Sequence, residues 1–218
     1  ILCRTKEVKR IFDELNQKTY FLGFTSKDCF RQHIKSQASR YLHVAGTSVY
    51  KGTSAIQKAW KTHPEFPHLT IIKRGRHFRK LKNLKQIRHF IDEKDLLLLQ
   101  NQSLVHLCLS STEGFGHYIM EAMSTGALVI TTNAPPMNEF ILDSSCLVPF
   151  KRTEKQNLAT LYHVNVEDVV KSVQSIKKLS KQELISIGNK NRARYLELKK
   201  EFLHNLETLI KSFLRNPI

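Results

Sequence analysis

The protein has 218 residues, 41% of them hydrophobic, which is enough to bury the core of one large domain and excludes a disordered tail. The longest conspicuous apolar run, Leu96–Leu99, is far short of the roughly 20 residues that a membrane-spanning helix needs. The formal net charge of +16 indicates an anionic partner, which could be nucleic acid, an anionic membrane surface or a phosphorylated substrate.

The first 22 residues have the pattern of a small strand, helix and strand unit, over Ile1–Cys3, Lys6–Asn16 and Thr19–Leu22. Residues 23–39 are polar and basic, and we interpret them as a linker that contains a short helix. We therefore expect residues 1–22 to be the end of a separate domain that precedes the main one.

Between residues 40 and 182, short apolar or β-branched runs alternate with helical stretches. The predicted strands are Tyr41–Ala45, Leu69–Ile72, Ile87–Ile91, Leu104–Leu109 and Ala127–Thr132. The predicted helices are Thr53–Lys61, Glu93–Asn101 and Gly116–Thr125. This alternation predicts an α/β fold, a Rossmann-like parallel sheet with helices on both faces. Such sheets bind ligands beyond the carboxyl ends of their strands, so the loops that follow strands are the candidate site.

From Glu167 onward the pattern is mostly helical. Over residues 183–218, apolar side chains recur near helical spacing, with Lys199, Lys200, Lys211 and Arg215 among them. We expect long C-terminal helices, the last of them amphipathic and suited to peripheral contact with an anionic membrane.

Cysteine and histidine spacing gives no support for a metal site. Cys3, Cys29, Cys108 and Cys146 are far apart and form no Cys-x-x-Cys pair, which we interpret as the reduced interior of a cytoplasmic protein. His43 and His106 alternate with apolar residues inside predicted strands, so they are interpreted as core residues.

The run Ser110–Gly116 follows a buried strand and opens a helix that Gly126 ends. Glycines let backbone N–H groups approach an anion closely, and the dipole of a helix N-terminus favours a phosphate there. On the glycines alone, an ordinary glycine-containing turn between a strand and a helix explains this segment equally well.

Two glutamates add a second signal to this segment. On one continuous helix Glu113 and Glu121 would point about 80° apart and lie about 12 Å from each other. With Glu113 on the loop instead, they can flank a ligand laid across the helix end. A nucleoside diphosphate sugar has this layout, because hydroxyl-bearing rings lie on either side of its diphosphate and carboxylates accept well from hydroxyls.

These residues resemble a known family. Glu113-Gly-Phe-Gly followed by Glu121-Ala-Met-Ser-Thr-Gly126 is similar to the Glu-x7-Glu signature of retaining, group 1 glycosyltransferases with the GT-B fold. The downstream Ala127–Glu139 and the upstream Gly46–Gly52 are similar to the same family, so the resemblance covers roughly residues 40–145. It implies the C-terminal, donor-binding half of a GT-B enzyme.

The resemblance implies a role for each matched residue. Glu113 and Lys51 would be catalytic, with Lys51 paired to the donor diphosphate and Glu113 in contact with the transferred sugar. The donor-binding residues would be Gly46, Thr47, Ser48, Gly114, Phe115, Gly116, His117, Tyr118, Glu121, Asn138 and Glu139. Glu121 would bind the ribose. Packing is an equal alternative for Phe115, and so is a helix start for Asn138 and Glu139. For His117, a plain surface position with no role beyond its backbone is favoured.

The family also implies a reaction. A sugar would pass from a nucleoside diphosphate, UDP or GDP, to a hydroxyl acceptor with retention and without a metal or other cofactor. Many family members carry an arginine where this chain has Thr47, which leaves the diphosphate with one cation fewer unless Ser48 or Arg74 compensates. Residues 1–22 would be the end of an N-terminal acceptor domain, 40–182 the donor-binding domain, and 183–218 a helix crossing back toward the acceptor domain.

Two alternatives remain open on the sequence. One is a nucleotide-sugar-binding module that depends on a partner chain for the acceptor domain. The other is a basic nucleic-acid-binding protein, although the chain shows no helix-turn-helix, zinc-finger or aromatic–basic signature and its lysines are spread throughout. We therefore expect no specific nucleic-acid partner.

Overall fold

The computed structural model describes residues 1–75 and 81–215, in strands and helices that alternate along most of the chain. The strands are β1 Leu2–Cys3, β2 Tyr20–Phe21, β3 Gln37–Gly46, β4 His68–Lys73, β5 Leu84–Ile87, β6 Ser103–Cys108, β7 Leu128–Thr132, β8 Leu147–Val148, β9 Phe150–Gln156 and β10 Ala159–Val164. The helices are α1 Lys6–Glu14, α2 Thr53–Thr62, α3 Glu93–Gln102, α4 His117–Ser124, α5 Val166–Lys177 and α6 Lys181–Arg215, with short 3₁₀ helices η1 Met137–Glu139 and η2 Ser144–Cys146.

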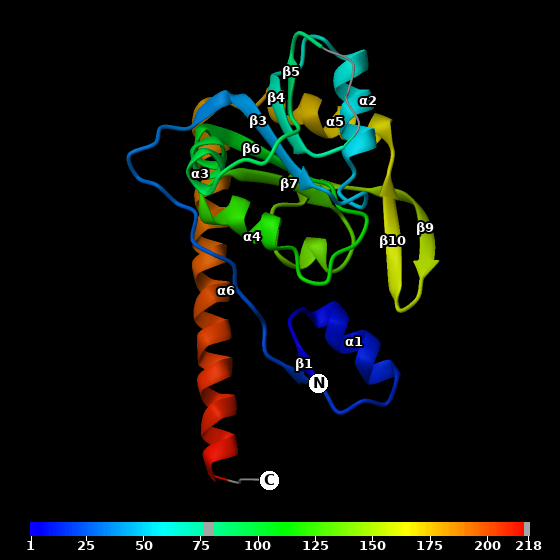
Figure 1. Ribbon diagram of the computed structural model, residues 1–218, viewed down its shortest axis with the longest axis vertical. Helices are drawn as coiled ribbons and strands as arrows, with labels where there is room; N and C mark the ends of the chain where they lie inside the picture. Colours follow the sequence, from blue (N-terminus) through cyan, green and yellow to red (C-terminus); the bar gives the residue numbers. More distant parts are fainter. Residues whose placement is uncertain (76–80, 216–218) are drawn as a thin grey trace.

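The centre of the fold is a six-stranded sheet in the order β5-β4-β3-β6-β7-β8, in which every pair of neighbours is parallel (Figure 1). This confirms the predicted α/β fold. The strand predicted at Ile87–Ile91 is wrong, because the chain enters the sheet earlier, with Leu84 opposite Leu69 and Ile87 opposite Ile72. Phe90, whose aromatic ring favoured the later strand, lies beyond it and is 72% exposed.

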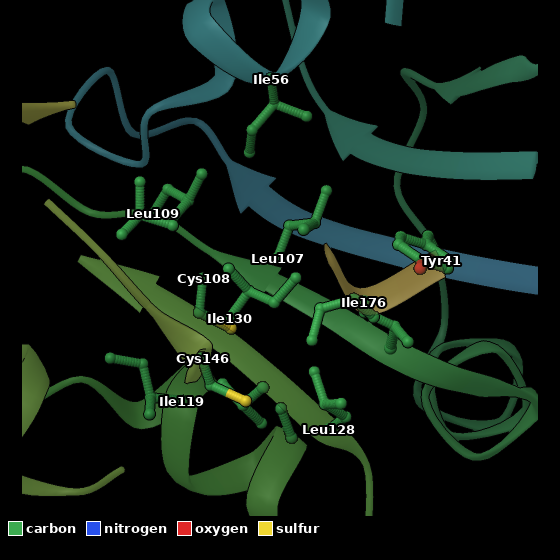
Figure 2. Close-up of a cluster of buried hydrophobic side chains, with 14 of the residues drawn as sticks. Tyr41, Ile56, Leu107, Cys108, Leu109, Ile119, Leu128, Ile130, Cys146 and Ile176 are labelled. Carbon is green, nitrogen blue, oxygen red and sulfur yellow. The ribbon is translucent and has the colours of Figure 1, made fainter. Parts of the chain in front are cut away.

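Helices cover both faces of the sheet. Alternate strand residues point to opposite faces, so Tyr41 and Ile71 pack with α2 residues, whereas Leu42 and Ile72 pack against α3. Tyr41 and Ile71 belong to the main hydrophobic cluster of the protein. Figure 2 shows the central part of this cluster, where Ile56 of α2 and Ile176 of α5 approach Leu107. Trp60 is fully buried there, and its indole N–H donates to the Pro67 carbonyl at 2.8 Å.

Residues 1–22 form a unit of their own beside this sheet. β1 pairs only with β2 among the described strands, in a two-stranded parallel sheet. α6, 35 residues long, runs from the main sheet to this unit, where the Asn205 side chain donates to the Leu22 carbonyl at 3.2 Å (Figure 1). Residues 216–218 of the predicted final helix lie outside the described part of the chain.

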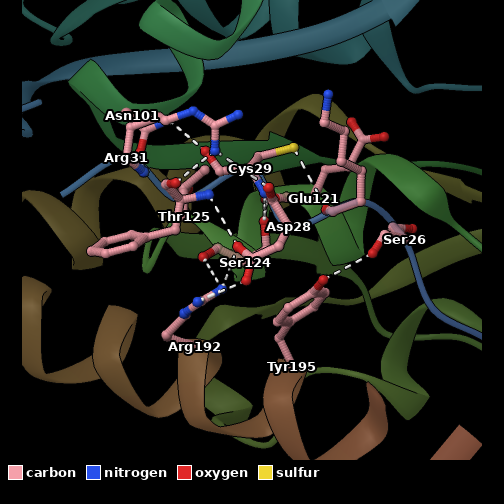
Figure 3. Close-up of polar contacts among 12 residues, drawn as sticks. Ser26, Asp28, Cys29, Arg31, Asn101, Glu121, Ser124, Thr125, Arg192 and Tyr195 are labelled. Atoms are coloured by element: carbon pink, nitrogen blue, oxygen red, sulfur yellow. Dashed lines mark hydrogen bonds and ion pairs between the residues drawn. The ribbon is translucent and has the colours of Figure 1, made fainter. Parts of the chain in front are cut away.

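The segment between the two units differs from the predicted linker, because residues 23–36 contain no helix and β3 begins at Gln37. The segment is instead an extended strap fixed by hydrogen bonds (Figure 3). Arg192 of α6 donates to both carboxylate oxygens of Asp28 at 2.7 and 2.9 Å, and the Cys29 N–H donates to Ser124 Oγ at 2.9 Å. Tyr195 donates to the Ser26 carbonyl at 2.8 Å.

The antiparallel hairpin β9–β10 is an element that the sequence analysis missed. Every residue of β9 is exposed, so the strand has no alternating apolar pattern by which it could be recognised. The hairpin is attached to the main body through the Tyr162 N–H, which donates to the Ser111 carbonyl at 2.7 Å. No helix in the described residues is long and apolar enough to cross a membrane.

Candidate functional site

The strand order reverses between β3 and β6. From β3 the chain moves outward through β4 and β5, then returns to place β6 against the other edge of β3. The loops that follow β3 and β6 therefore leave in opposite directions and open a crevice at the carboxyl ends of the strands, which is where ligands bind in sheets of this type. Residues 46–52 and 109–116 form these two loops.

The two loops are joined to each other. The Ser111 N–H donates to the Tyr50 carbonyl at 2.8 Å, and the Ser111 hydroxyl contacts the same oxygen at 3.2 Å. Gly52 makes the close approach possible, because its φ is 69° and a Cβ there would lie 2.1 Å from the Leu109 carbonyl oxygen. Any other residue would push the loops apart, so Gly52 holds Lys51 against the turn after β6.

Lys51 and Glu113, the two residues predicted to be catalytic, meet in this crevice. The Lys51 ammonium forms an ion pair with Glu113 Oε1, and their side chains are only 18% and 12% exposed. The Ser110 hydroxyl also contacts Glu113 Oε1 and lies 2.6 Å from the Tyr118 hydroxyl. The Lys51 ammonium is 3.9 Å from the centroid of the Tyr118 ring. The pair is thus held on several sides.

Glu121, on the side of α4, belongs to the same cluster. Its Oε2 accepts a hydrogen bond of 3.2 Å from the buried Gln100 amide of α3. Burial raises the pKa of the Glu121 carboxyl, and the nearby His117, Lys27 and Lys51 only partly oppose this. At the end of β6, burial raises the pKa of the Cys108 thiol, which also responds to the charges of Lys51, Glu113 and Glu121. Lys51, Glu113 and Glu121 therefore all lie near this strand end.

The N-terminus of α4 opens into the same region. Gly116 begins the helix with a φ of 105°, and no side chain caps it. The amides of the first turn are therefore without a side-chain acceptor and can meet an anion. His117 is exposed, and its Nδ1 lies 2.8 Å from Ser26 Oγ in the strap. Gly114 is exposed as well, with open space where a Cβ would stand.

Phe115 has the surroundings of a packing residue. It is 3% exposed, and its ring makes edge contacts with the rings of Phe24, His117 and Phe140 at 5.0–5.5 Å between centroids. Its backbone remains part of the turn, so the expected contribution of Phe115 to ligand binding is limited to main-chain atoms.

The loop after β3 has a cation that sequence reasoning missed. Thr47 is exposed, and Lys73, at the end of the neighbouring strand β4, donates from its ammonium to the Ser48 carbonyl at 2.8 Å. The Arg74 N–H donates to the Gly46 carbonyl at 2.9 Å, whereas its guanidinium lies over the Phe90 ring. The signal for Lys73 was its position, since it directly follows the last apolar residue of the predicted strand Leu69–Ile72.

Asn138 and Glu139 have other partners. The Asn138 amide donates to Asn133 Oδ1 at 3.2 Å, within the loop after β7. The Glu139 carboxylate accepts from the backbone N–H groups of Lys6 and Glu7 at 2.8 and 2.9 Å, at the start of α1. Both residues lie in the short helix η1 that follows Pro135 and Pro136, which agrees with their alternative interpretation as part of a helix. The contacts of the Glu139 carboxylate are with the start of α1.

The four cysteines are buried free thiols, and His43 and His106 are core residues. His43 is hydrogen-bonded through both ring nitrogens, to the Leu107 carbonyl at 2.7 Å and to Thr53 Oγ1 at 2.9 Å. Burial lowers the pKa of each imidazole to about 4, so both are neutral at pH 7. Across residues 1–75 and 81–215, no group of three His, Cys, Asp or Glu side chains is arranged to hold a metal ion.

Comparison with known proteins gives the family. The family model described as "Glycosyl transferases group 1" matches residues 30–161. Among solved structures, the pneumococcal O-GlcNAc transferase GtfA in complex with UDP and GlcNAc is similar, with 17% identity and a TM-score of 0.70 over 99% of this chain and 45% of that one. Sucrose-phosphate synthase from Thermosynechococcus elongatus is 12% identical, with a TM-score of 0.72 over 99% of this chain and 58% of that one.

A third similar structure is the C-terminal domain of a glycosyl transferase group 1 family protein (LpcC) from Francisella tularensis. It is 16% identical, with a TM-score of 0.58 over 80% of this chain and 97% of that one. No curated protein matches the chain in sequence. The likeness to these structures shows the fold, and the chain spans about half the length of the first two, 45% and 58%.

Proposed function

Because this chain belongs to the glycosyl transferases group 1 family, we propose that it is the donor-binding half of a retaining glycosyltransferase that uses a nucleoside diphosphate sugar. The observation that carries the proposal is the cluster of Lys51, Glu113 and Glu121 beside the uncapped N-terminus of α4, at the point where the strand order reverses. A cation, backbone amides and two carboxylates in one crevice suit a ligand that has a diphosphate between two hydroxyl-bearing rings.

In the proposed complex the diphosphate lies between Lys51 and the first-turn amides of α4. In the ligand-free protein the Lys51 charge is neutralised by Glu113. An arriving diphosphate would compete for Lys51, and this would release Glu113 to accept from hydroxyls of the transferred sugar. Glu121 would accept from the ribose.

The diphosphate needs a second cation, because it carries at least two negative charges. We propose that Lys73 supplies it from the end of β4, where its ammonium already lies at the loop that follows β3. This would replace the arginine that is absent at Thr47. Donation to the Ser48 carbonyl would keep Lys73 at the crevice before the ligand arrives.

The proposed reaction needs no nucleophile from the protein and no metal ion. The bond between the anomeric carbon and the diphosphate oxygen breaks, and the acceptor oxygen bonds to the same face of that carbon. The acceptor proton passes to the departing diphosphate. Catalysis then consists of positioning, together with stabilisation of the leaving group's charge by Lys51, Lys73 and the α4 amides. UDP or GDP is the nucleotide we expect.

Residues 1–22 are proposed to be the end of an acceptor domain, since they form their own sheet across the strap from the donor loops. The last turns of α6 extend away from the body and expose Ile210, Phe213 and Leu214 near Lys211 and Arg215 (Figure 1). We propose that this end contacts an anionic membrane surface. Cosedimentation with phosphatidylserine vesicles but not with phosphatidylcholine vesicles would support it, and equal sedimentation in both would contradict it.

A thermal-shift screen against UDP-, GDP- and ADP-sugars tests the proposed donor site. A ligand at a hundred times its dissociation constant stabilises the folded state by about 2.7 kcal/mol, which is a readily measured shift of the melting temperature. We expect one nucleotide to give this shift and the free sugars to give none. No shift with any of the three nucleotide sugars would contradict the proposal.

A further inference from the structure

The start of α1 is completed by a residue far away in the chain. Thr5 caps the helix by accepting from the Val8 N–H at 3.2 Å, but the N–H groups of Lys6 and Glu7 need other acceptors. Both donate to Glu139, to Oε2 at 2.8 Å and to Oε1 at 2.9 Å. The Glu139 carboxylate thus binds the positive end of the α1 dipole, although it is 133 and 132 residues away from these two N–H groups in the sequence.

Glu139 is also tied to the crevice loops. It ends η1, which follows β7 at the carboxyl edge of the sheet, and the ring of the next residue, Phe140, lies 5.5 Å from that of Phe115. Phe115 belongs to the turn that carries Glu113. A continuous path of contacts therefore runs from the α1 amides through Glu139, Phe140 and Phe115 to the crevice.

The space beside this path is not filled. A cavity of about 270 Å³ lies between the two units, lined by side chains that include Arg4, Lys6, Phe115, Glu139 and Arg194. Arg194 Nε is buried there without a hydrogen-bond partner. Packing is incomplete at this place, so the two charge-assisted hydrogen bonds of Glu139 contribute to the position of α1 together with the contacts of residues 1–22 to α6.

We propose that Glu139 is a positioning residue, which seats the unit of residues 1–22 against the donor loops so that a ligand in the crevice and the start of α1 are coupled. This inference rests on the proposed function, because the coupled ligand is the nucleotide of the donor. Glu139 itself does not touch that ligand. Its carboxylate fixes the position of residues 1–22 relative to the donor loops. The contact between the Phe140 and Phe115 rings couples this position to the loop that carries Glu113.

The test is amide hydrogen exchange of the full chain with and without UDP, and with GDP or ADP if one of those is the nucleotide that binds. In the wild type, we expect slow exchange at Lys6 and Glu7 that slows further when nucleotide binds. In Glu139→Ala, exchange at these amides should rise roughly tenfold to a hundredfold, as expected for the loss of a hydrogen bond to a charged group. The nucleotide should then leave it unchanged, and the nucleotide dissociation constant should rise by no more than the factor by which nucleotide slows exchange in the wild type.

Two further variants complete the design. Glu139→Gln keeps the shape and one acceptor oxygen, so it should fold normally and give an intermediate coupling. Glu201→Gln lines the same cavity without contacting the α1 amides and should behave as the wild type. If nucleotide still slows exchange at Lys6 and Glu7 in Glu139→Ala, or has no effect there in the wild type despite binding, the positioning role is wrong. If no nucleotide binds the wild type, the proposed donor site itself fails, which is a separate result.

Discussion

The Lys51 ammonium lies 3.9 Å from the centre of the Tyr118 ring, although Lys51 belongs to the loop after β3 and Tyr118 to the first turn of α4. A cation over an aromatic face is stabilised by the ring quadrupole, and here the same tyrosine shares Ser110 with the carboxylate that pairs with Lys51. Lys51 is therefore placed at the crevice before any ligand arrives. A preplaced cation loses little conformational entropy when it binds an anion, which suits it to a diphosphate site.

Substitution of the two glutamates should separate an enzyme from a binding module. If Glu121 contacts the ribose equally before and during reaction, Glu121→Gln should weaken donor binding and raise KM with little change in kcat. If Glu113 holds the transferred sugar more tightly as its bond breaks, Glu113→Gln should lower kcat by roughly a hundredfold. Turnover is measured with the proposed acceptor-binding half present, and Glu65→Gln, at an exposed position between α2 and β4, is the control. Equal small losses of activity in both variants would mean that the two glutamates have only a structural role.

The second cation can be tested by charge removal at Lys73. We expect Lys73→Met to weaken binding of the nucleoside diphosphate roughly fivefold at low salt, and less at high salt, because the interaction is electrostatic. Binding of the corresponding nucleoside should not change. Lys85→Met, on the adjacent strand but exposed, serves as the control. A loss of the same size for nucleoside and diphosphate in calorimetric titrations would show that Lys73 does not face the phosphates.

Glu121 should make stability depend on pH. Burial raises the pKa of its carboxyl above the ordinary value of 4.5, so the folded state binds the proton more tightly than the unfolded state. Stability is then lost as pH rises through this raised pKa, and the loss is complete above it. Glu121→Gln keeps an acceptor for Gln100 without the charge. Urea unfolding should therefore show this variant to be at least as stable as the wild type at pH 7.5, with the difference narrowing toward pH 4. A variant that is less stable at pH 7.5 would contradict this.

Gly52 should be irreplaceable for steric reasons. Gly52→Ala places a Cβ 2.1 Å from the Leu109 carbonyl at a φ of 69°, and we expect it to destabilise the fold by about 2 kcal/mol or more. Gly114→Ala, where nothing lies within 4 Å of the added carbon, should cost little. Denaturant midpoints of the two variants make the comparison. Equal midpoints would mean that the two loops part without strain.

The sheet could be predicted because its strands are locally distinct. Leu104–Leu109 and Ala127–Thr132 are largely apolar runs between helical stretches. β7 lies within the second run, and β6 is displaced from the first by one residue. β9 could not be predicted in the same way, since all seven of its residues are exposed and it pairs only with its neighbour in the hairpin. The strand near Ile87 was misplaced because aromatic and β-branched residues favour a strand whether or not they are buried.

The candidate site residues could be proposed from the sequence, but their contacts with one another could not. The turn at Glu113 and the helix with Glu121 could be recognised from spacing, but the pairing of Glu113 with Lys51 bridges 62 residues and depends on how two loops meet. The role of Glu139 depends on α1, whose amides lie more than a hundred residues earlier. Lys73 was missed because it becomes part of the crevice only through the pairing of β4 with β3, which places it opposite Gly46.

The most direct test of the donor site is a calorimetric titration of the nucleotide sugar selected by the screen into three proteins. These are the wild type, Lys51→Met and Lys61→Met, the last of which removes the same charge from an exposed position near the end of α2 and is the protein meant to stay within twofold of the wild type. Loss of a charged hydrogen-bond partner of about 1.5–3 kcal/mol should weaken binding to Lys51→Met by at least tenfold and leave Lys61→Met within twofold of the wild type. Equal affinities in all three proteins would contradict the assignment of this crevice as the donor site.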